Sequence, residues 1–201
     1  MRSQVTGKPL PRLGGALCLD FVNTIDPRLK PPREEFLGSF EKLVEWAQFI
    51  GLLTPAERRS LVDRTTPAVA KAVFSRAIEL RASLYQLFRQ PNAAPARALK
   101  VLNTELRRAG GSPSLEFRQG RYRMRWPSSA AAERLIGPIA RSASELVTSP
   151  ELQRVRECAG DGCGWLFVDT SRAHRRRWCS MSICGNRLKA RRHRQRTAAR
   201  R

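Results

Sequence analysis

The amino-acid sequence predicts an α+β fold: a mainly helical amino-terminal domain with a small antiparallel sheet, followed by a small cysteine-bearing module that ends in a basic helix. Three observations predict this fold. Capped, amphipathic stretches recur through the first 150 of the 201 residues, one segment alternates apolar and polar residues around a Gln-Gly turn, and two close cysteine pairs stand near the carboxyl terminus. We therefore expect a boundary at residue 150, between a larger domain (1–150) and a carboxyl-terminal module (151–201).

Caps and glycines mark most of the helices of the larger domain. The segments from Ser39 to Ile50 and from Pro95 to Ala109 are amphipathic, and each ends before a glycine, the residue that best ends a helix. Thr54-Pro55-Ala56-Glu57 is a capping box with proline at the first helical position. Thr66-Pro67 gives a similar start signal to the next helix.

The helix after Thr66 is expected to be the spine of the core. Its apolar residues recur at spacings of four, seven, four and three, which line one face of a helix of about six turns. They are Val69, Val73, Leu80, Leu84 and Leu87. A further helix spans Ala132 to Leu146, and we expect Gly137-Pro138 to kink it because proline removes a backbone donor.

Extended segments are fewer. SLEFRQGRYRMRW, residues 114–126, alternates on both sides of Gln119-Gly120 and predicts a hairpin. LCLDFVNTI, residues 17–25, is rich in strand formers and is expected to add to the same sheet. Within it, Asp20 and Asn23 are candidate contacts of a ligand pocket, although a cap and turn at a strand end is the interpretation that we favour.

The larger domain carries no pattern typical of an active site. It has no glycine-rich phosphate loop, no histidine and no nucleophile beside a base, so we expect that the protein is not an enzyme. Its two tryptophans, Trp46 and Trp126, are expected in the core rather than as stacking platforms.

The charge of the chain points to a polyanionic partner. Lys and Arg number 38 against 17 Asp and Glu, a net charge of +21, and the last 51 residues alone hold 14 against 4. Nucleic acid therefore leads, ahead of an anionic membrane surface. The apolar run LGGALCLDFV is broken by Asp20 and is too short to span a bilayer or to serve as a signal, so we expect a cytoplasmic, nucleoid-associated protein without a membrane partner.

The four cysteines of the carboxyl-terminal module form two close pairs. Cys158 and Cys163 are separated by four residues, as are Cys179 and Cys184, with fifteen residues between the pairs. Such pairs bring four thiolates around one tetrahedral ion, and four sulfurs leave no position for water, which predicts one structural zinc. The alternatives are an iron–sulfur cluster, four unliganded thiols, or a site that includes His174, which we expect at the surface.

The module is expected to fold around this site. GWLFV, residues 164–168, reads as a strand whose Trp165 and Phe167 cover the metal. A helix should begin near Ser182 with Cys184 in its first turn, where the helix start stabilises a thiolate. Ile183 and Leu188 are expected to hold this helix against the metal site.

Basic and amide residues of this module are the candidate nucleic-acid contacts. Most arginines should meet phosphates, whereas Asn186 and Arg187 are candidates for reading base edges. The full set is Arg172, Arg175, Arg176, Arg177, Asn186, Arg187, Lys189, Arg191, Arg192, Arg194 and Arg196.

The module resembles a known zinc finger. WLFVDTS, RRWCSM and the block Cys184-Gly185-Asn186-Arg187 match the CGNR zinc finger, which is named for those four residues. LCLDFVNT, residues 17–24, makes the larger domain similar to the ABATE domain, which usually precedes that finger in stress-induced transcription regulators of bacteria. The resemblance implies zinc binding by the four cysteines and a role in binding DNA.

We therefore expect a DNA-binding transcription regulator. The larger domain would dimerise or sense a signal, so a second copy of the chain and an unidentified small-molecule effector are candidate partners. The alternative is an RNA-binding protein in which Trp165 and Trp178 stack on unpaired bases, although we favour core packing of both tryptophans.

Overall fold

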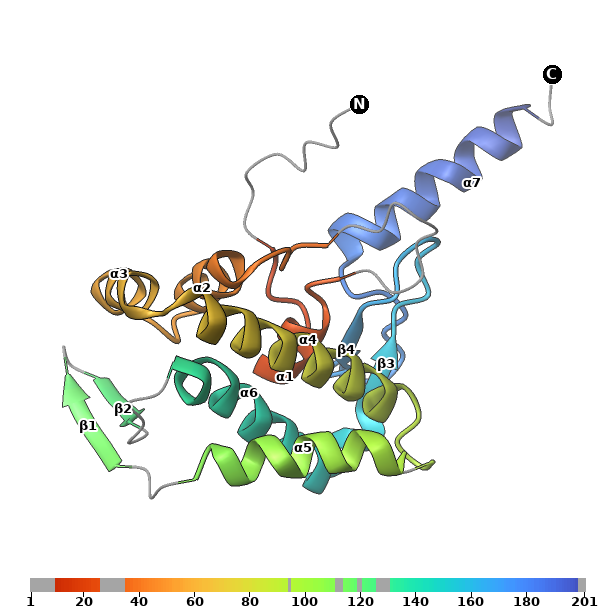
Figure 1. The fold of residues 1–201 in the computed structure, drawn as a ribbon. Coiled ribbons are helices and arrows are strands. Elements are labelled where there is room, and N and C mark those ends of the chain that lie inside the picture. Colours follow the sequence, from red (N-terminus) through yellow and green to blue (C-terminus); the bar gives the residue numbers. More distant parts are fainter. Residues whose placement is uncertain are drawn as a thin grey trace.

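The computed structural model describes residues 10–25, 35–93, 95–110, 114–118, 121–125 and 131–198 (Figure 1). In chain order the larger domain contains α1 (Leu17–Val22), α2 (Phe40–Phe49), α3 (Pro55–Arg64), α4 (Pro67–Arg89), α5 (Ala96–Arg108), β1 (Ser114–Arg118), β2 (Arg121–Arg125) and α6 (Ala131–Thr148). The carboxyl-terminal module contains the 3₁₀ turn η1 (Pro150–Arg154), β3 (Val155–Glu157), β4 (Leu166–Val168), the π-helical turn η2 (Met181–Gly185) and α7 (Asn186–Ala198). The α+β fold class is thus confirmed.

The predicted caps start the helices. The side chain of Ser39 accepts a hydrogen bond from the amide of Lys42 at the start of α2, and Thr66 caps α4 in the same way. Thr54 and Glu57 form both bonds of the capping box before α3. These bonds satisfy amide donors that the first turn of a helix leaves without partners, so the boundaries follow from local sequence.

The long helix α4 is the spine of the core. It packs against α1, α2, α5 and α6, and Leu80 and Leu84 are fully buried. Val69, which the apolar spacing also assigned to the buried stripe, is 46% exposed, and this part of the prediction is wrong. Val69 lies in the first turn of α4, at the third residue of the helix.

The hairpin predicted around Gln119-Gly120 is confirmed. Strands β1 and β2 pair antiparallel, with Leu115 opposite Met124 and Phe117 opposite Tyr122. The sheet has two strands, because residues 17–22 do not join it. Trp126 and the Gln-Gly turn itself lie outside the described residues.

The strand predicted over residues 17–25 is wrong, because α1 occupies most of it. Leu19 and Phe21 of this helix are fully buried, since α1 lies against α4, α6 and β4. A short run that is buried on nearly every side has no polar face, so its pattern cannot distinguish a helix from a strand. The carboxylate of Asp20 accepts a hydrogen bond of 2.8 Å from the amide of Gly14, which fixes the chain just before the helix.

Trp46 and helix α6 also belong to the predicted core. Trp46 is buried as expected, with its ring 5.3 Å from that of Phe21. Helix α6 continues through Pro138, and a Cβ on Gly137 would stand 3.1 Å from the Cβ of Ala109. This glycine therefore lets α6 approach the end of α5 closely.

Cys18, the cysteine outside the two pairs, lies in the core of the larger domain. Its exposed fraction is 0%, and its amide donates a hydrogen bond of 3.2 Å to the hydroxyl of Ser142. Burial raises the pKa of the Cys18 thiol to about 12. The thiol is therefore an unreactive packing group.

The larger domain and the module share one core. The side chain of Asn23 donates to the carbonyl of Leu166 and accepts from its amide, both at 2.8 Å. On the same strand, the amide of Val168 donates to the carbonyl of Gly14 at 2.9 Å. Leu166 and Val168 are buried in the hydrophobic core that contains α1 and α4. Strand β4 thus belongs to the packing of both units.

Within the part of the chain that the structure describes, no helix combines the length and the apolar character needed to cross a membrane.

Candidate metal centre and nucleic-acid interface

The four cysteines of the module converge on one point. Their sulfur atoms all lie within 4.8 Å of one another, and all four residues are buried. The Cys163 and Cys179 sulfurs are 3.9 Å apart, and those of Cys179 and Cys184 are 3.6 Å apart. A tetrahedral ion with metal–sulfur bonds of about 2.3 Å places its sulfurs about 3.8 Å apart, so the cluster has the dimensions of a single-ion site.

Glycines of the loop before Cys163 permit this convergence. A Cβ on Gly160 would lie 2.9 Å from the Cβ of Cys184 and 3.3 Å from the sulfur of Cys158. Gly162 has a φ of 68°, in the left-handed region that favours glycine. A larger residue at position 160 would push the two cysteine pairs apart.

Backbone amides prepare the cluster for a cation. The sulfur of Cys158 accepts from the amides of Gly160 at 3.4 Å and Cys179 at 3.3 Å. Hydrogen bonds from the Cys163 and Cys179 thiols, together with these amides, lower the pKa of Cys158. The resulting thiolate raises the pKa of Cys163 to about 12 and also raises that of Cys179. A cation that neutralises the crowded sulfurs is therefore required before all four can ionise.

Aromatic side chains cover the cluster. Phe167 is fully buried against it, and Trp165 and Trp178 pack half-buried around it, with their indole nitrogens buried. This agrees with the cover expected from the strand GWLFV. Ile183, expected to hold the helix, is instead 37% exposed, and Leu188 alone of the two is half-buried.

The helical turn after Cys179 starts slightly earlier than expected. Ser180 caps η2 by accepting from the amide of Ile183, and Cys184 lies within that turn. A Cβ on Gly185 would overlap the sulfur of Met181, so a side chain there would displace the methionine. Helix α7 follows directly, with Asn186 and Arg187 at its start.

Family comparisons match almost the whole chain. The ABATE model, described as "Putative stress-induced transcription regulator", matches residues 15–150, more than half of the sequence. The chain belongs to the ABATE family. The CGNR zinc finger model matches residues 154–197 of the module. A comparison with curated proteins gives no match.

The CGNR finger holds one structural zinc. Its four clustered thiolates fit the tetrahedral sulfur set of structural zinc sites, and four sulfurs complete the coordination sphere. An iron–sulfur cluster of several irons would need its cysteines further apart. His174 is exposed, as expected, and its ring nitrogen faces the carbonyl of Asp169 at 3.4 Å.

Helix α7 carries most of the predicted nucleic-acid contacts away from the ABATE domain. Figure 1 shows it projecting from the finger beyond the rest of the molecule. The side chains of these candidates are exposed at Asn186, Arg187, Lys189, Arg191, Arg194 and Arg196. Arg192 lies in the helix, but its side chain is outside the described set. Arg191 forms an ion pair with Asp161 of the finger, which ties the second turn of α7 to the first cysteine pair.

The other predicted contacts lie in residues 170–177, which we call the arginine loop. Arg172, Arg175 and Arg177 are exposed, and the Arg177 guanidinium lies 5.5 Å above the ring of Trp178. Arg176 differs from them. Its guanidinium stacks 4.3 Å above the ring of Phe167 and donates to the carbonyls of Trp178 and Cys179. It therefore supports the finger from inside, a role that its place in a basic run did not indicate.

The predicted pocket residues Asp20 and Asn23 are engaged within the chain. Asp20 bonds to Gly14, and Asn23 bonds to the backbone of Leu166. Burial raises the pKa of the Asp20 carboxyl. Neither residue lines the cavities of about 640 and 300 Å³ found among the described residues.

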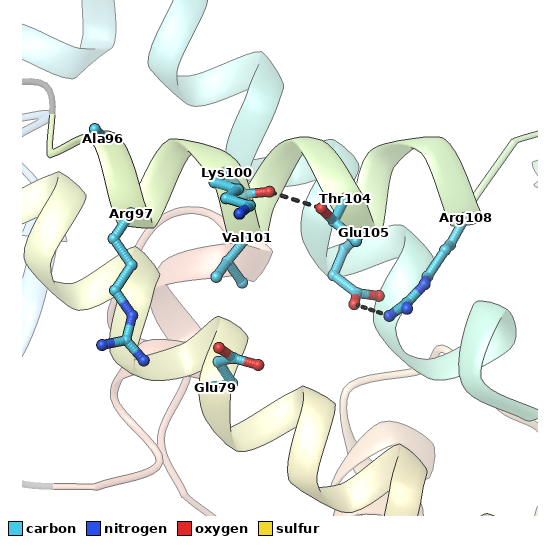
Figure 2. A pocket seen from close by; sticks show the side chains of 8 residues that line it. All are labelled: Glu79, Ala96, Arg97, Lys100, Val101, Thr104, Glu105 and Arg108. Carbon is cyan, nitrogen blue, oxygen red and sulfur yellow. Dashed lines mark hydrogen bonds and ion pairs between the residues drawn. The ribbon is translucent and has the colours of Figure 1, made fainter.

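The larger of these cavities is an open groove between α4 and α5 (Figure 2). Glu105 of this groove is 4% exposed and forms ion pairs with Arg76 at 2.6 Å and Arg108 at 2.9 Å. Arg97 and Lys100 add positive charge to its rim. Charged residues of both signs thus line the groove, and its buried carboxylate is already paired.

We expect the purified protein to contain one zinc per chain and to lose it as the pH falls. The metal-free cluster binds protons at Cys163 and Cys179, whose pKa values are raised, so zinc binding releases protons and acid favours the metal-free state. Affinity should drop roughly tenfold per pH unit for each proton displaced. Elemental analysis and competition with a chelator at about pH 7.5 and 5.5 check this. Stoichiometric iron, or zinc retention independent of pH, would contradict it.

Proposed function

We propose that the protein is a DNA-binding transcription regulator whose CGNR finger contacts the duplex. The observation that carries the proposal is that both basic elements are attached to the zinc ligands. The arginine loop ends beside Cys179, and α7 begins two residues after Cys184. Because the zinc site forms a rigid base, the basic helix is already held in place before it enters a DNA groove.

The packing of the two tryptophans of the finger supports DNA over RNA. Stacking on an unpaired base requires an aromatic ring with an open face. Trp165 and Trp178 instead pack against the cysteine cluster, and Arg177 lies over the ring of Trp178. A duplex, whose phosphates meet arginines and whose groove admits a helix, matches the exposed groups better.

Binding to several nucleic acids tests this proposal. Zinc-loaded protein is titrated with duplex DNA, structured RNA and single-stranded DNA at two salt concentrations. We expect the tightest binding to the duplex, with an affinity that falls steeply as salt rises. Tighter binding to RNA at both salt concentrations would favour the alternative function, and no binding to any of them would reject a nucleic-acid role.

Arg187 should contribute sequence preference, whereas Arg194 and Arg196 should contribute charge. Arg187 stands next to the zinc-fixed turn, so its change to alanine should cost about 1–3 kcal/mol mainly on a preferred duplex. Changing Arg194 or Arg196 should weaken all duplexes alike and lower the salt slope by about one unit per contact. Titration of a selected and a scrambled duplex separates the two effects. Equal losses on both duplexes for Arg187→Ala would show that it contributes only charge.

The proposal extends to the ABATE domain. We propose that this domain senses a signal or forms a dimer, and that the protein acts at the nucleoid in the cytoplasm. The groove of Figure 2 is the candidate place for a charged effector, because Glu79, Arg97 and Lys100 line it. We also propose that the chain is a binding protein rather than an enzyme, since four sulfur ligands leave the zinc no position for a reacting water.

A further inference from the structure

A buried carboxylate lies within the most basic part of the chain. Asp169 follows β4, and its exposed fraction is 0%. Its amide donates to the carbonyl of Arg154 at 2.9 Å, which continues the pairing of β3 with β4. The residue is therefore fixed to the sheet of the finger immediately before the arginine loop.

The carboxylate joins the two ends of the arginine loop. One oxygen accepts from the amide of Ser171 at 2.9 Å and from its hydroxyl at 2.6 Å, and the other accepts from the amide of Arg176 at 2.9 Å. Burial acts to raise the pKa of the Asp169 carboxyl, but these hydrogen bonds outweigh it and the pKa is lowered. The group is therefore an anion that accepts from donors at both ends of the loop.

The inside of the loop is closed by further bonds. The hydroxyl of Ser171 accepts from the amide of Arg175 at 3.3 Å, and the carbonyl of Ser171 accepts from the amide of His174 at 3.1 Å. His174 takes a φ of 49°, which turns the chain sharply. The carbonyl of Arg177 then accepts from the amide of Ala159, beside the first zinc ligand. Backbone freedom between residues 169 and 177 is thus largely removed.

The arginine side chains remain available. Among the described residues, every hydrogen bond that the Asp169 carboxylate accepts comes from a backbone amide or a hydroxyl, and none comes from a guanidinium. Arg172 and Arg175 are exposed on the loop that it shapes. An arginine on a fixed backbone loses less conformational freedom when it binds a phosphate than one on an unconstrained loop.

We propose that Asp169 is a positioning residue for DNA binding: it builds the loop that presents Arg172 and Arg175 to the phosphate backbone of a duplex. The inference rests on the proposed function. It differs from an account based on charge alone, because removing a negative charge near DNA should strengthen binding if charge alone decides it.

A matched pair of variants separates the two accounts. Asp169→Asn and Glu151→Gln each raise the net charge of the carboxyl-terminal module by one, but Glu151 is exposed in η1 and lies outside both the arginine loop and α7. In zinc-loaded full-length protein, Glu151→Gln should bind a labelled duplex as tightly as the unaltered chain or more tightly. Asp169→Asn should bind about tenfold more weakly, the cost of ordering two arginines on a loosened loop. Equal or tighter binding by Asp169→Asn would overturn the proposal.

A second comparison excludes a general structural effect. The double variant Arg172→Ala/Arg175→Ala should lower the salt slope by about two, one for each phosphate contact. Adding Asp169→Asn to it should change duplex affinity less than about twofold, because the side chains that it positions are gone. A full tenfold loss in that background would show that Asp169 acts through the whole finger, and would also overturn the proposal.

Zinc content and melting temperature are measured for each variant. If Asp169→Asn fails to retain zinc, Ser171→Ala serves instead, since it removes two loop bonds and keeps the carboxylate. It should weaken duplex binding about threefold in the unaltered chain and have no effect in the double variant; any other result rejects the proposal. If the unaltered protein binds no duplex, the proposed function itself fails, which distinguishes that outcome from a failure of the loop.

Discussion

Replacing Cys179 with serine should unfold the finger and also destabilise the ABATE domain. A structural zinc contributes about 10–16 kcal/mol in small finger peptides, which is as large as the whole stability of an ordinary domain. Leu166 and Val168 of the finger are buried in the shared core, and burial of each contributes roughly 1.5–3 kcal/mol. The ABATE helices should remain at room temperature but melt about 10 °C lower or more.

Circular dichroism with heating, together with zinc analysis, checks this expectation. Cys18→Ala is the matched control, because Cys18 is buried but lies outside the cysteine cluster. It should keep one zinc per chain. The helix caps and apolar patterns of the ABATE domain do not involve the finger, so the sequence alone indicates two units that fold independently. An unchanged ABATE melting temperature in Cys179→Ser would support that independence and contradict the shared core.

Changing Asn23 to alanine should destabilise the protein by about 2–5 kcal/mol, because it removes both hydrogen bonds to Leu166 and leaves a buried amide and carbonyl without partners. Denaturant unfolding of the zinc-loaded protein measures this. Asn103→Ala is the control: Asn103 is exposed on α5, and alanine suits a helix, so no loss is expected. If the two variants unfold at the same denaturant concentration, Asn23 does not join the two units.

Each feature that could be predicted from the sequence is indicated by residues that lie close together along the chain. The capping box at Thr54, the hairpin pattern and the two cysteine pairs each depend on local spacing, and the structure forms all three. The resemblance to the ABATE domain and the CGNR finger also rested on short motifs, and both family models match.

The features that could not be predicted depend on contacts between distant parts of the chain. Asn23 and Leu166 are 143 residues apart, and no pattern around either one indicates the other. Helix α1 is too short and too completely buried for its period to be read. Arg176 looks like its basic neighbours in sequence, and only the fold places Phe167 beneath its guanidinium.

The most direct test is whether zinc holds the proposed DNA-binding surface together. Duplex affinity is measured for the zinc-loaded full chain, for the same protein after chelation, and after one equivalent of zinc is returned. We expect duplex affinity to fall at least about tenfold on chelation and to recover on reloading, because the arginine loop and α7 lose their common base without zinc. Unchanged duplex affinity after chelation would contradict it and would show that charge alone binds the DNA.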